Sequence, residues 1–388
     1  MYKSTPNIKL ASKQDCTGCS ACSTTCPTNS IVMRKDNEGF LQPSIDPKTC
    51  IECHKCEHSC PIISPKPIDI SDPNSYVARS NSDNVLKQST SGGIFYTLAE
   101  WIINKKGVVF GARFNEQWEL VHDYTETIEG LKPFMRSKYI QSSTGDTFKQ
   151  AKQFLQQGRY VLFVGTPCQI GGLKSYLHKE YDNLLLVDFV CHGVPSPKIW
   201  KKYLKEKCST SEVSYVSFRD KEKGWDGLYE MKINYGKKSY RSDSERDEYL
   251  YGFLNNYSLR QCCYSCKFKS RSRHSDITIA DAWGVEEYMP TMYSKKGASL
   301  VLIHTLKGNQ IYSEISNLIM SQHVEIDAAL QYNRRATTSV PHTHYRAFFF
   351  VVTKWISVKS AIRAITWLQK EKKRLVAYKQ SIRQICHT

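Results

Sequence analysis

The chain has 388 residues, of which 40% are hydrophobic, and this is enough to build two or three domains with real cores. No apolar run approaches the roughly 20 residues that a helix needs to span a bilayer, and the N-terminus lacks the apolar stretch of a signal peptide, so we expect a soluble, cytoplasmic protein. The formal charge of +17 is concentrated near the C-terminus; because no nucleic-acid recognition motif accompanies it, we do not expect a nucleic-acid partner.

Two copies of a four-cysteine motif lie near the N-terminus. The pattern C-x2-C-x2-C-x3-C-P occurs as CTGCSACSTTCP at 16–27 and as CIECHKCEHSCP at 50–61. In two-cluster ferredoxins the fourth cysteine of each run binds the other cluster. A zinc site usually takes two separated pairs of ligands, and disulfides belong to secreted chains. We therefore predict two [4Fe–4S] clusters with crossed ligands, one held by Cys16, Cys19, Cys22 and Cys60 and the other by Cys50, Cys53, Cys56 and Cys26.

The segment between the two motifs, SIVMRKDNEGFLQPSID, alternates around a DNEG turn and predicts a β-hairpin. A stretch rich in Pro, Ser and Asp follows the second motif and predicts a linker. The predicted fold class is an α+β ferredoxin-like two-cluster domain, then an α/β domain with a largely parallel or mixed sheet, then a C-terminal helical tail. The expected boundaries are a ferredoxin-type domain at 1–66, a linker at 67–75, a larger α/β domain at 76–340 and a basic helical tail at 341–388.

A small-residue loop precedes the first predicted helix of the larger domain. In QSTSGGIFYTLAEWI, Ser91, Gly92 and Gly93 stand immediately before an amphipathic helix expected at 94–103. Small residues at that place let a phosphate approach exposed backbone N–H groups, where the helix dipole favours negative charge. The signal is weak, since a serine can equally well cap a helix without any ligand. The sequence contains neither a G-x-G-x-x-G fingerprint nor a P-loop.

Two strand–loop–helix units follow and predict parallel strands with crossover helices. The first has a strand at 161–164 and a helix near 170–177, and the second has a strand at 184–190 and a helix from about residue 198. Ligands of open α/β sheets collect at the carboxyl ends of the strands. Cys168 and Cys191 each come a few residues after a strand end, so we expect both to face one crevice.

A C-x-x-C pair, Cys263 and Cys266, precedes another predicted strand at 277–280. Together with Cys168 and Cys191 it would supply the four thiolates of a third [4Fe–4S] cluster. On the pattern alone, the two strand-end cysteines could instead be ordinary buried residues, with the C-x-x-C pair redox-active or bound to zinc. Cys262 could also replace Cys263 as the ligand. We expect Cys208 and Cys386 to be free thiols.

The C-terminal tail has the pattern of a basic amphipathic helix. Apolar residues recur at helical spacing in Val358, Ile362, Ile365 and Leu368, among the cationic residues Lys359, Arg363, Lys370, Lys373 and Arg374. Three interpretations stay open: the apolar stripe packs on the chain's own domain, the helix docks to an acidic partner such as a small electron carrier, or it lies on an anionic membrane surface.

Six motifs in order across residues 76–340 resemble the coenzyme F420 hydrogenase/dehydrogenase β-subunit family, which also includes a flavin- and cluster-dependent chlorophyll-pathway reductase. They are STSGGIFYTLAEWI, RSKYIQSS, GTPCQIGGLKSYL, DFVCHGVPSPKIW, FRDKEKGW and CxxCKFKSRSRHSDITIADAWG. The resemblance implies one [4Fe–4S] cluster and FAD in this core. The cysteines of the family's cluster correspond to Cys168, Cys191, Cys263 and Cys266, and its flavin loops correspond to Ser91, Gly92, Gly93, Lys138, Tyr139, Gln141 and Ser142.

The resemblance predicts an iron–sulfur flavoprotein oxidoreductase that exchanges single electrons with a partner protein and electron pairs with a substrate, for which a deazaflavin is one candidate. Lys138 would stabilise reduced flavin, or else is a solvated surface lysine. His192 would donate a proton or support the neighbouring ligand, or else caps its loop. Arg219, Asp220 and Trp225 would line a substrate cleft, or else form a salt-bridged turn. Two other classes of function stay open: an electron-transfer subunit without substrate chemistry, and a cluster-bearing interaction protein.

Overall fold

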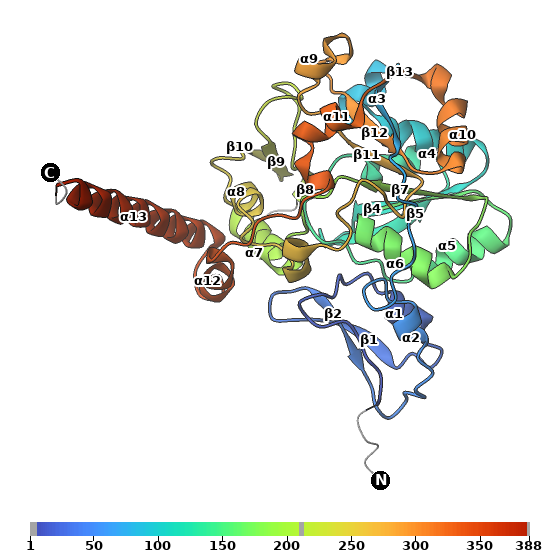
Figure 1. Cartoon of the computed structure of the whole chain (residues 1–388), viewed down its shortest axis with the longest axis horizontal. Coiled ribbons are helices and arrows are strands. Elements are labelled where there is room, and N and C mark those ends of the chain that lie inside the picture. Colours follow the sequence, from blue (N-terminus) through green and yellow to red (C-terminus); the bar gives the residue numbers. More distant parts are fainter. Residues whose placement is uncertain (1–5, 209–212, 386–388) are drawn as a thin grey trace.

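The computed structural model of the chain describes residues 6–208 and 213–385. Figure 1 shows a small N-terminal domain below a larger α/β body, from which one long C-terminal helix projects. Cys386, predicted as a free thiol, lies outside the described residues. Among the residues described, no helix is both long and apolar enough to cross a membrane.

The N-terminal domain contains the predicted hairpin, which is confirmed. Strands β1 and β2 pair antiparallel, with Ile31 opposite Ile45. In the turn between them, the Asp36 carboxylate accepts the backbone N–H groups of Glu38 and Phe40 at 2.9 and 3.0 Å. A short helix begins in each cysteine motif, directly after a residue in the left-handed conformation, Ser20 or His54. These elements are α1 (Ala21–Thr25), β1 (Ile31–Lys35), β2 (Leu41–Ile45) and α2 (Lys55–His58).

The body is built on an eight-stranded mixed sheet with the order β13-β3-β12-β11-β7-β6-β4-β5. Its centre is parallel, since β4, β6, β7 and β11 pair parallel in turn, and the strands toward both edges are antiparallel. The predicted fold class is therefore confirmed. The strands are β3 (Asn74–Ser80), β4 (Val108–Phe114), β5 (Leu120–Thr125), β6 (Val161–Gly165), β7 (Leu184–Phe189), β11 (Ile277–Asp281), β12 (Ser299–Ile303) and β13 (Ile319–His323).

Helices cover both faces of this sheet because the central strands are apolar on both sides. Val109, Leu162 and Leu185 pack with α4 and α10 on one face, whereas Phe110 and Phe163 pack with α5 and α6 on the other. The helices of the body are α3 (Asp83–Gln88), α4 (Ile94–Asn104), α5 (Thr147–Gln156), α6 (Pro167–Leu177), α9 (Val285–Tyr288), α10 (Leu306–Glu314) and α11 (Ile326–Tyr332). Short 3-10 turns lie at Glu129–Phe134, Gln261–Ser265, Pro290–Met292, Ser316–Leu318 and Arg334–Ala336.

Two boundaries differ from the prediction for local reasons. Helix α6 begins at Pro167, three residues earlier than expected, because Thr166 and Gln169 form a capping box and proline occupies the first helical position. Cys168 therefore lies in the first turn of a helix and not in a loop. Strand β3 begins at Asn74, inside the segment predicted as linker, because it pairs with β12 and β13 far along the chain.

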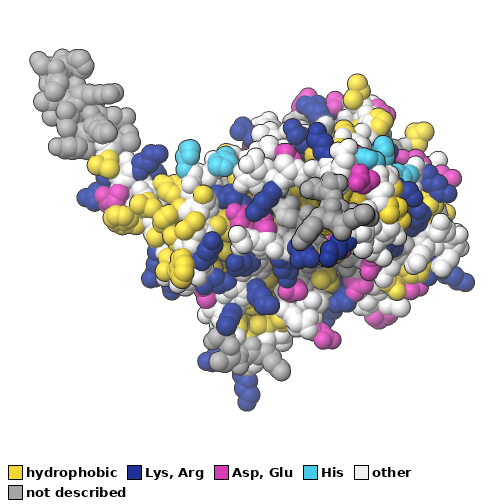
Figure 2. Space-filling view, turned by 90° about the horizontal axis from the view of Figure 1, so that it is seen from below, with side chains coloured by type: hydrophobic (Ala, Val, Ile, Leu, Met, Phe, Trp, Pro, Cys, Tyr) yellow, Lys and Arg dark blue, Asp and Glu magenta, His cyan; other side chains and the backbone are white. Residues whose placement is uncertain are grey.

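A smaller antiparallel sheet, β10-β9-β8, packs with α7, α8 and the start of the tail. Val358, Ile362 and Ile365 of α13 are buried there, which agrees with the packing interpretation for the first two turns of the helix. Figure 2 shows hydrophobic side chains gathered where the projecting helix leaves the body. The elements are β8 (Val213–Ser217), β9 (Glu230–Tyr235), β10 (Lys238–Asp243), α7 (Pro197–Lys207), α8 (Glu248–Leu254), α12 (Tyr345–Val352) and α13 (Val358–Ile385).

Candidate functional site

The first crossed set of cysteines comes together beside the body. We call Cys16, Cys19, Cys22 and Cys60 the inner set. Burial raises the pKa of Cys22 well above its usual value, and the charges of Cys19, Cys16 and Cys60 act in the same direction. Cys60, from the second motif, therefore lies among the cysteines of the first, as crossed ligation requires.

The second crossed set lines a cavity of about 20 Å³ in the same domain. We call Cys26, Cys50, Cys53 and Cys56 the outer set. The cavity is otherwise lined mostly by isoleucine side chains, and Cys53 is exposed at the surface. Burial raises the pKa of Cys56 to about 11, and the nearby Cys26 acts in the same direction. The fold thus brings Cys26 of the first motif to three cysteines of the second, and the assignment of these residues as ligands stays a prediction.

A third group of cysteines lines a cavity of about 40 Å³ in the body, which we call the thiolate cavity. The core set, Cys168, Cys191, Cys263 and Cys266, is present in full, and Cys262 lines the cavity as well. Burial raises the pKa of Cys168, and the charges of Cys266, Cys191 and Cys263 also raise it. Sequence reasoning expected Cys168 and Cys191 to meet at the strand ends, and the structure places both there.

Cys262 and Cys263 are neighbouring candidates for one ligand position, and their thiol groups have different pKa values. A hydrogen bond from Cys262 lowers the pKa of Cys263 to about 7, and the charges of Arg260 and Lys269 act in the same direction against burial. The pKa of Cys262 is instead raised. Both thiols line the thiolate cavity, so the assignment of Cys263 as the ligand stays a prediction.

No group of three or more His, Cys, Asp or Glu side chains converges on a point where a single metal ion would fit, as far as residues 6–208 and 213–385 show. A single zinc ion needs its ligands around one point. A cubane cluster is larger and takes one thiolate at each of its four iron corners, so its ligands stand farther apart.

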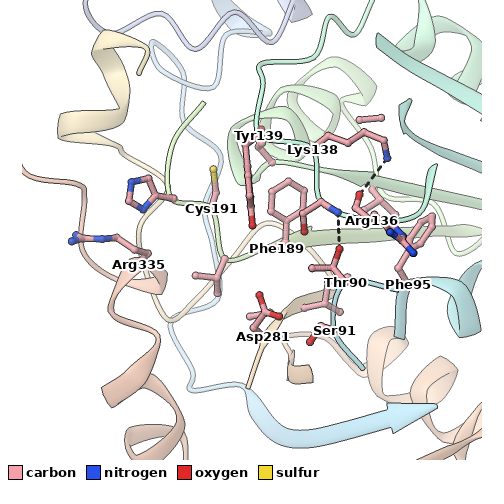
Figure 3. A pocket seen from close by; sticks show the side chains of 18 of the residues that line it. Thr90, Ser91, Phe95, Arg136, Lys138, Tyr139, Phe189, Cys191, Asp281 and Arg335 are labelled. Carbon is pink, nitrogen blue, oxygen red and sulfur yellow. Dashed lines mark hydrogen bonds between the residues drawn. The ribbon is translucent and has the colours of Figure 1, made fainter. Parts of the chain in front are cut away.

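A much larger cavity, of about 530 Å³, opens at the carboxyl ends of the central strands, and we call it the main cavity. Gly165 ends β6 in its floor, and Phe189 ends β7. Figure 3 shows Tyr139 and Phe189 in the middle of the cavity, with Cys191 and Arg335 on one side and Phe95 and Arg136 on the other. This position at the strand ends, and the volume, are typical of a cofactor site.

The main cavity and the thiolate cavity share a wall. The segment 191–194 lines both, so Cys191 stands between them. In the same segment, His192 Nε2 lies 2.7 Å from the Asn256 side-chain oxygen, and its ring meets the Phe253 ring edge-on. Burial lowers the pKa of His192 to about 4, so the ring is neutral at physiological pH and donates to Asn256. His192 holds the shared wall in place, which agrees with the loop-capping interpretation.

Lys138 is not a solvated surface lysine. Its ammonium group donates to the backbone carbonyls of Phe134, Met135 and Arg136 at 3.2, 2.8 and 3.2 Å. All three of its protons are thereby used, so the group acts on the cavity through its charge and not through a hydrogen bond. Burial, with the charge of Arg136, lowers the pKa of Lys138 to about 7.

Some residues of the predicted flavin loops line the main cavity, and others contact the sheet or the N-terminal domain. Ser91, Gly93, Tyr139 and Ser142 line the main cavity with Lys138, whereas Gly92 and Gln141 do not. A Cβ atom at Gly92 would lie 2.5 Å from the Ala78 carbonyl oxygen, so this glycine is required by packing on the sheet. The Gln141 amide donates to the Thr17 carbonyl at 2.8 Å and faces the N-terminal domain.

The FRDKEKGW residues lie behind the cavity wall. Arg219 pairs with Asp281 at 2.5 Å, and its guanidinium lies 4.4 Å from the centre of the Tyr229 ring. The Trp225 indole donates to the same Asp281 carboxylate at 2.8 Å, and Asp220 faces Arg241. None of Arg219, Asp220 and Trp225 lines the main cavity, whose wall here is formed by other residues that sequence reasoning missed: Tyr229, Asp281 and Trp283.

The missed aromatic residues had a usable signal. Phe189 is the last residue of β7, and Trp283 comes two residues after β11. The rule that places ligands at the carboxyl ends of parallel strands points to both positions. Sequence reasoning applied the rule only to cysteines.

Two family models match this chain. Residues 158–328 match the model for the C-terminal part of the beta subunit of coenzyme F420 hydrogenase/dehydrogenase, and residues 15–62 match a 4Fe-4S dicluster domain. A chain of the F420-reducing [NiFe] hydrogenase complex from Methanosarcina barkeri is similar at 14% identity and a TM-score of 0.45, over 69% of this chain and 91% of that chain. No curated protein matches the sequence. Residues 158–328 of this chain therefore carry the C-terminal region of the coenzyme F420 hydrogenase/dehydrogenase beta-subunit family, and residues 15–62 carry a 4Fe-4S dicluster domain.

Proposed function

We propose that this chain is an iron–sulfur flavoprotein oxidoreductase. The dicluster domain and the core set would hold three [4Fe–4S] clusters, and the main cavity would hold FAD. When bound, FAD would exchange single electrons with the clusters and electron pairs with a substrate. The observation that carries this proposal is the wall at 191–194, which separates the core cysteines from the main cavity by a single segment of chain.

The cysteine sets stand in an order that suits a relay. Asp15, Thr17 and Ile62 of the N-terminal domain line the thiolate cavity, so the inner set adjoins the core set. The outer set lies in a separate cavity whose Cys53 is exposed. A redox partner protein would therefore approach the outer set, and the chain would connect that surface to the main cavity through the inner and core sets.

The residues of the main cavity fit an anionic, aromatic cofactor. Ser89, Thr90 and Ser91 lie with Gly93 beside the N-terminus of the 11-residue helix α4, where backbone N–H groups favour phosphate. Arg136, Lys138, Arg334 and Arg335 also line the cavity, and the carboxylate in its wall, Asp281, is paired with Arg219. Tyr139, Phe189, Tyr229 and Trp283 supply aromatic surface for a flat ring system.

The depressed pKa of Lys138 predicts a pH dependence of cofactor binding. The ammonium is charged below pH about 7 and neutral above it, whereas an ordinary lysine stays charged to about 10.4. FAD affinity is therefore expected to fall as the pH rises through 7, because the cavity loses one positive charge. Between pH about 7 and pH about 10.4, Lys138 is protonated in the unfolded chain and neutral in the folded chain. The contribution of Lys138 to the free energy of unfolding therefore rises with pH between these two values.

Titration of the flavin-free protein with FAD at about pH 6 and pH 8 measures this effect. The Lys138→Met variant should bind FAD more weakly at the lower pH and should lose most of the difference between the two. Lys132→Met is the matched control, since Lys132 is exposed on the same segment. Equal pH dependence in the wild type and in Lys138→Met would show that another group carries the effect.

The proposal as a whole is tested by cofactor content after anaerobic purification. We expect about twelve iron and twelve acid-labile sulfide per chain, with one FAD. Cys263→Ser should lower the iron count to about eight, and Cys262→Ser should leave it near twelve. A wild-type count near eight would contradict the core cluster, and absence of FAD would contradict the flavin site. An anaerobic screen of electron donors and acceptors, including a deazaflavin, would then identify the substrate by the flavin absorbance.

A further inference from the structure

Arg260 is a fully buried arginine at the junction of the N-terminal domain and the body. Its side chain is 1% exposed. The guanidinium donates to the carbonyls of Cys16 and Leu41 at 2.7 and 2.8 Å and to the Gln141 side-chain oxygen at 2.9 Å. It also lies 5.4 Å from the centre of the Phe40 ring. These three acceptors are neutral.

The other arginines that are buried among the described residues, Arg219, Arg273 and Arg346, have carboxylate partners. Arg219 pairs with Asp281 at 2.5 Å, Arg273 with Asp188 at 3.7 Å, and Arg346 with Glu38. Among the described residues, Arg260 makes no ion pair with a carboxylate, although it is the most deeply buried of the four. A buried charge without a countercharge is costly, so Arg260 implies an anion that the protein part does not supply.

The place of Arg260 indicates which anions these are. The guanidinium bonds the carbonyl of Cys16, a member of the inner set. The same side chain lines the thiolate cavity with Cys263 and Cys266 of the core set. A [4Fe–4S] cluster with four thiolates carries net negative charge, and its potential responds to nearby charge and to solvent exposure.

We propose that Arg260 is the shared countercharge of the inner and core clusters. Its positive charge raises the reduction potential of both clusters and offsets the repulsion between two neighbouring reduced clusters. The inference rests on the proposed function, because it needs a cluster at the core set. The outer set lacks this arginine, so its potential is set independently.

The test is a redox titration of the anaerobically purified protein, followed by EPR. In Arg260→Gln, both neighbouring clusters should become about tenfold harder to reduce, which is a lowering of about 59 mV for a one-electron couple, and the outer cluster should be unchanged. Arg260→Lys keeps the charge and should show a smaller shift. This variant also serves if the glutamine variant does not fold.

Arg346→Gln is the matched control, because Arg346 is buried at the same junction and has its own carboxylate. It should leave all three potentials near their wild-type values. Twelve iron in the wild type with unmoved potentials in Arg260→Gln would overturn this inference alone, as would an equal shift in all three clusters. A wild-type count near eight would overturn the core cluster and this inference together.

Discussion

Replacing Gly172 by leucine is expected to push the inner set away from the body and, with FAD in the main cavity as proposed, to slow reduction of the flavin by an external one-electron donor. Gly172 lies inside α6 with ordinary helical backbone, so conformation does not require glycine there. A Cβ atom at this position would lie 2.8 Å from the Cys19 sulfur and 2.9 Å from its Cβ. Overpacking of this kind costs about 1–3 kcal/mol, which the contact between the two domains must absorb.

Stopped-flow reduction under anaerobic conditions separates the two stages of the relay. The clusters of the dicluster domain should be reduced at the wild-type rate, and the flavin should follow more slowly. Iron analysis of the same sample distinguishes a displaced domain from a lost cluster. Gly227→Leu is the control, because no atom lies within 4 Å of a Cβ there and its backbone is unstrained. Unchanged flavin reduction in Gly172→Leu would show that electrons do not cross at this contact.

Replacing Asp188 by alanine is expected to destabilise the body by about 3–5 kcal/mol, because it leaves a buried arginine unpaired. Asp188 is 1% exposed at the end of β7, 3.7 Å from the Arg273 guanidinium, and it also accepts the Thr278 hydroxyl. Cys191 follows three residues later, so the shared wall depends on the same strand end. The apparent melting temperature should fall by roughly 5–15 °C.

Two further variants show whether the lost ion pair is the cause. Asp146→Asn removes a carboxylate that pairs with Lys149 at an exposed site, and it should change stability by less than about 0.5 kcal/mol. The double variant Asp188→Leu/Arg273→Met replaces the buried pair by apolar residues and should recover much of the loss. If the double variant melts as low as Asp188→Ala, the loss comes from the other contacts of the pair, which are those of Asp188 with the Thr278 hydroxyl and those of Arg273 with three backbone carbonyls.

The sequence predicted those features that depend on local spacing. The cysteine motifs indicated two clusters, alternation indicated the hairpin, and strand ends indicated the meeting of Cys168 with Cys191. The sequence does not show the surroundings of a residue when they depend on a distant neighbour. Gly92 looks like a phosphate-binding glycine until β3 and β12 are seen to pack against it. Gln141 stands in a flavin-like motif but faces the N-terminal domain, where its amide donates to the Thr17 carbonyl.

Arg260 illustrates the same limit. The residues next to Arg260 in the sequence do not show whether its side chain is exposed or buried. Its burial depends on β2 and the Cys16 loop, which come more than 200 residues earlier in the chain. The lack of a carboxylate near Arg260 becomes noticeable only by comparison with Arg219, Arg273 and Arg346, each of which pairs with a carboxylate.

The exposure of Cys53 has a consequence for the way in which this protein would fail in air. Oxidants attack accessible sulfur first, and the outer set is the one that reaches the surface. Cys16, Cys19 and Cys60 are buried where the two domains meet. Oxidative damage would therefore begin at the outer set. It would interrupt electron exchange with the partner protein while the inner and core sets stay intact. On the proposed function, the outer cluster would then be the first centre to be lost, and rebuilding that one site would restore the protein as long as the inner and core clusters were intact.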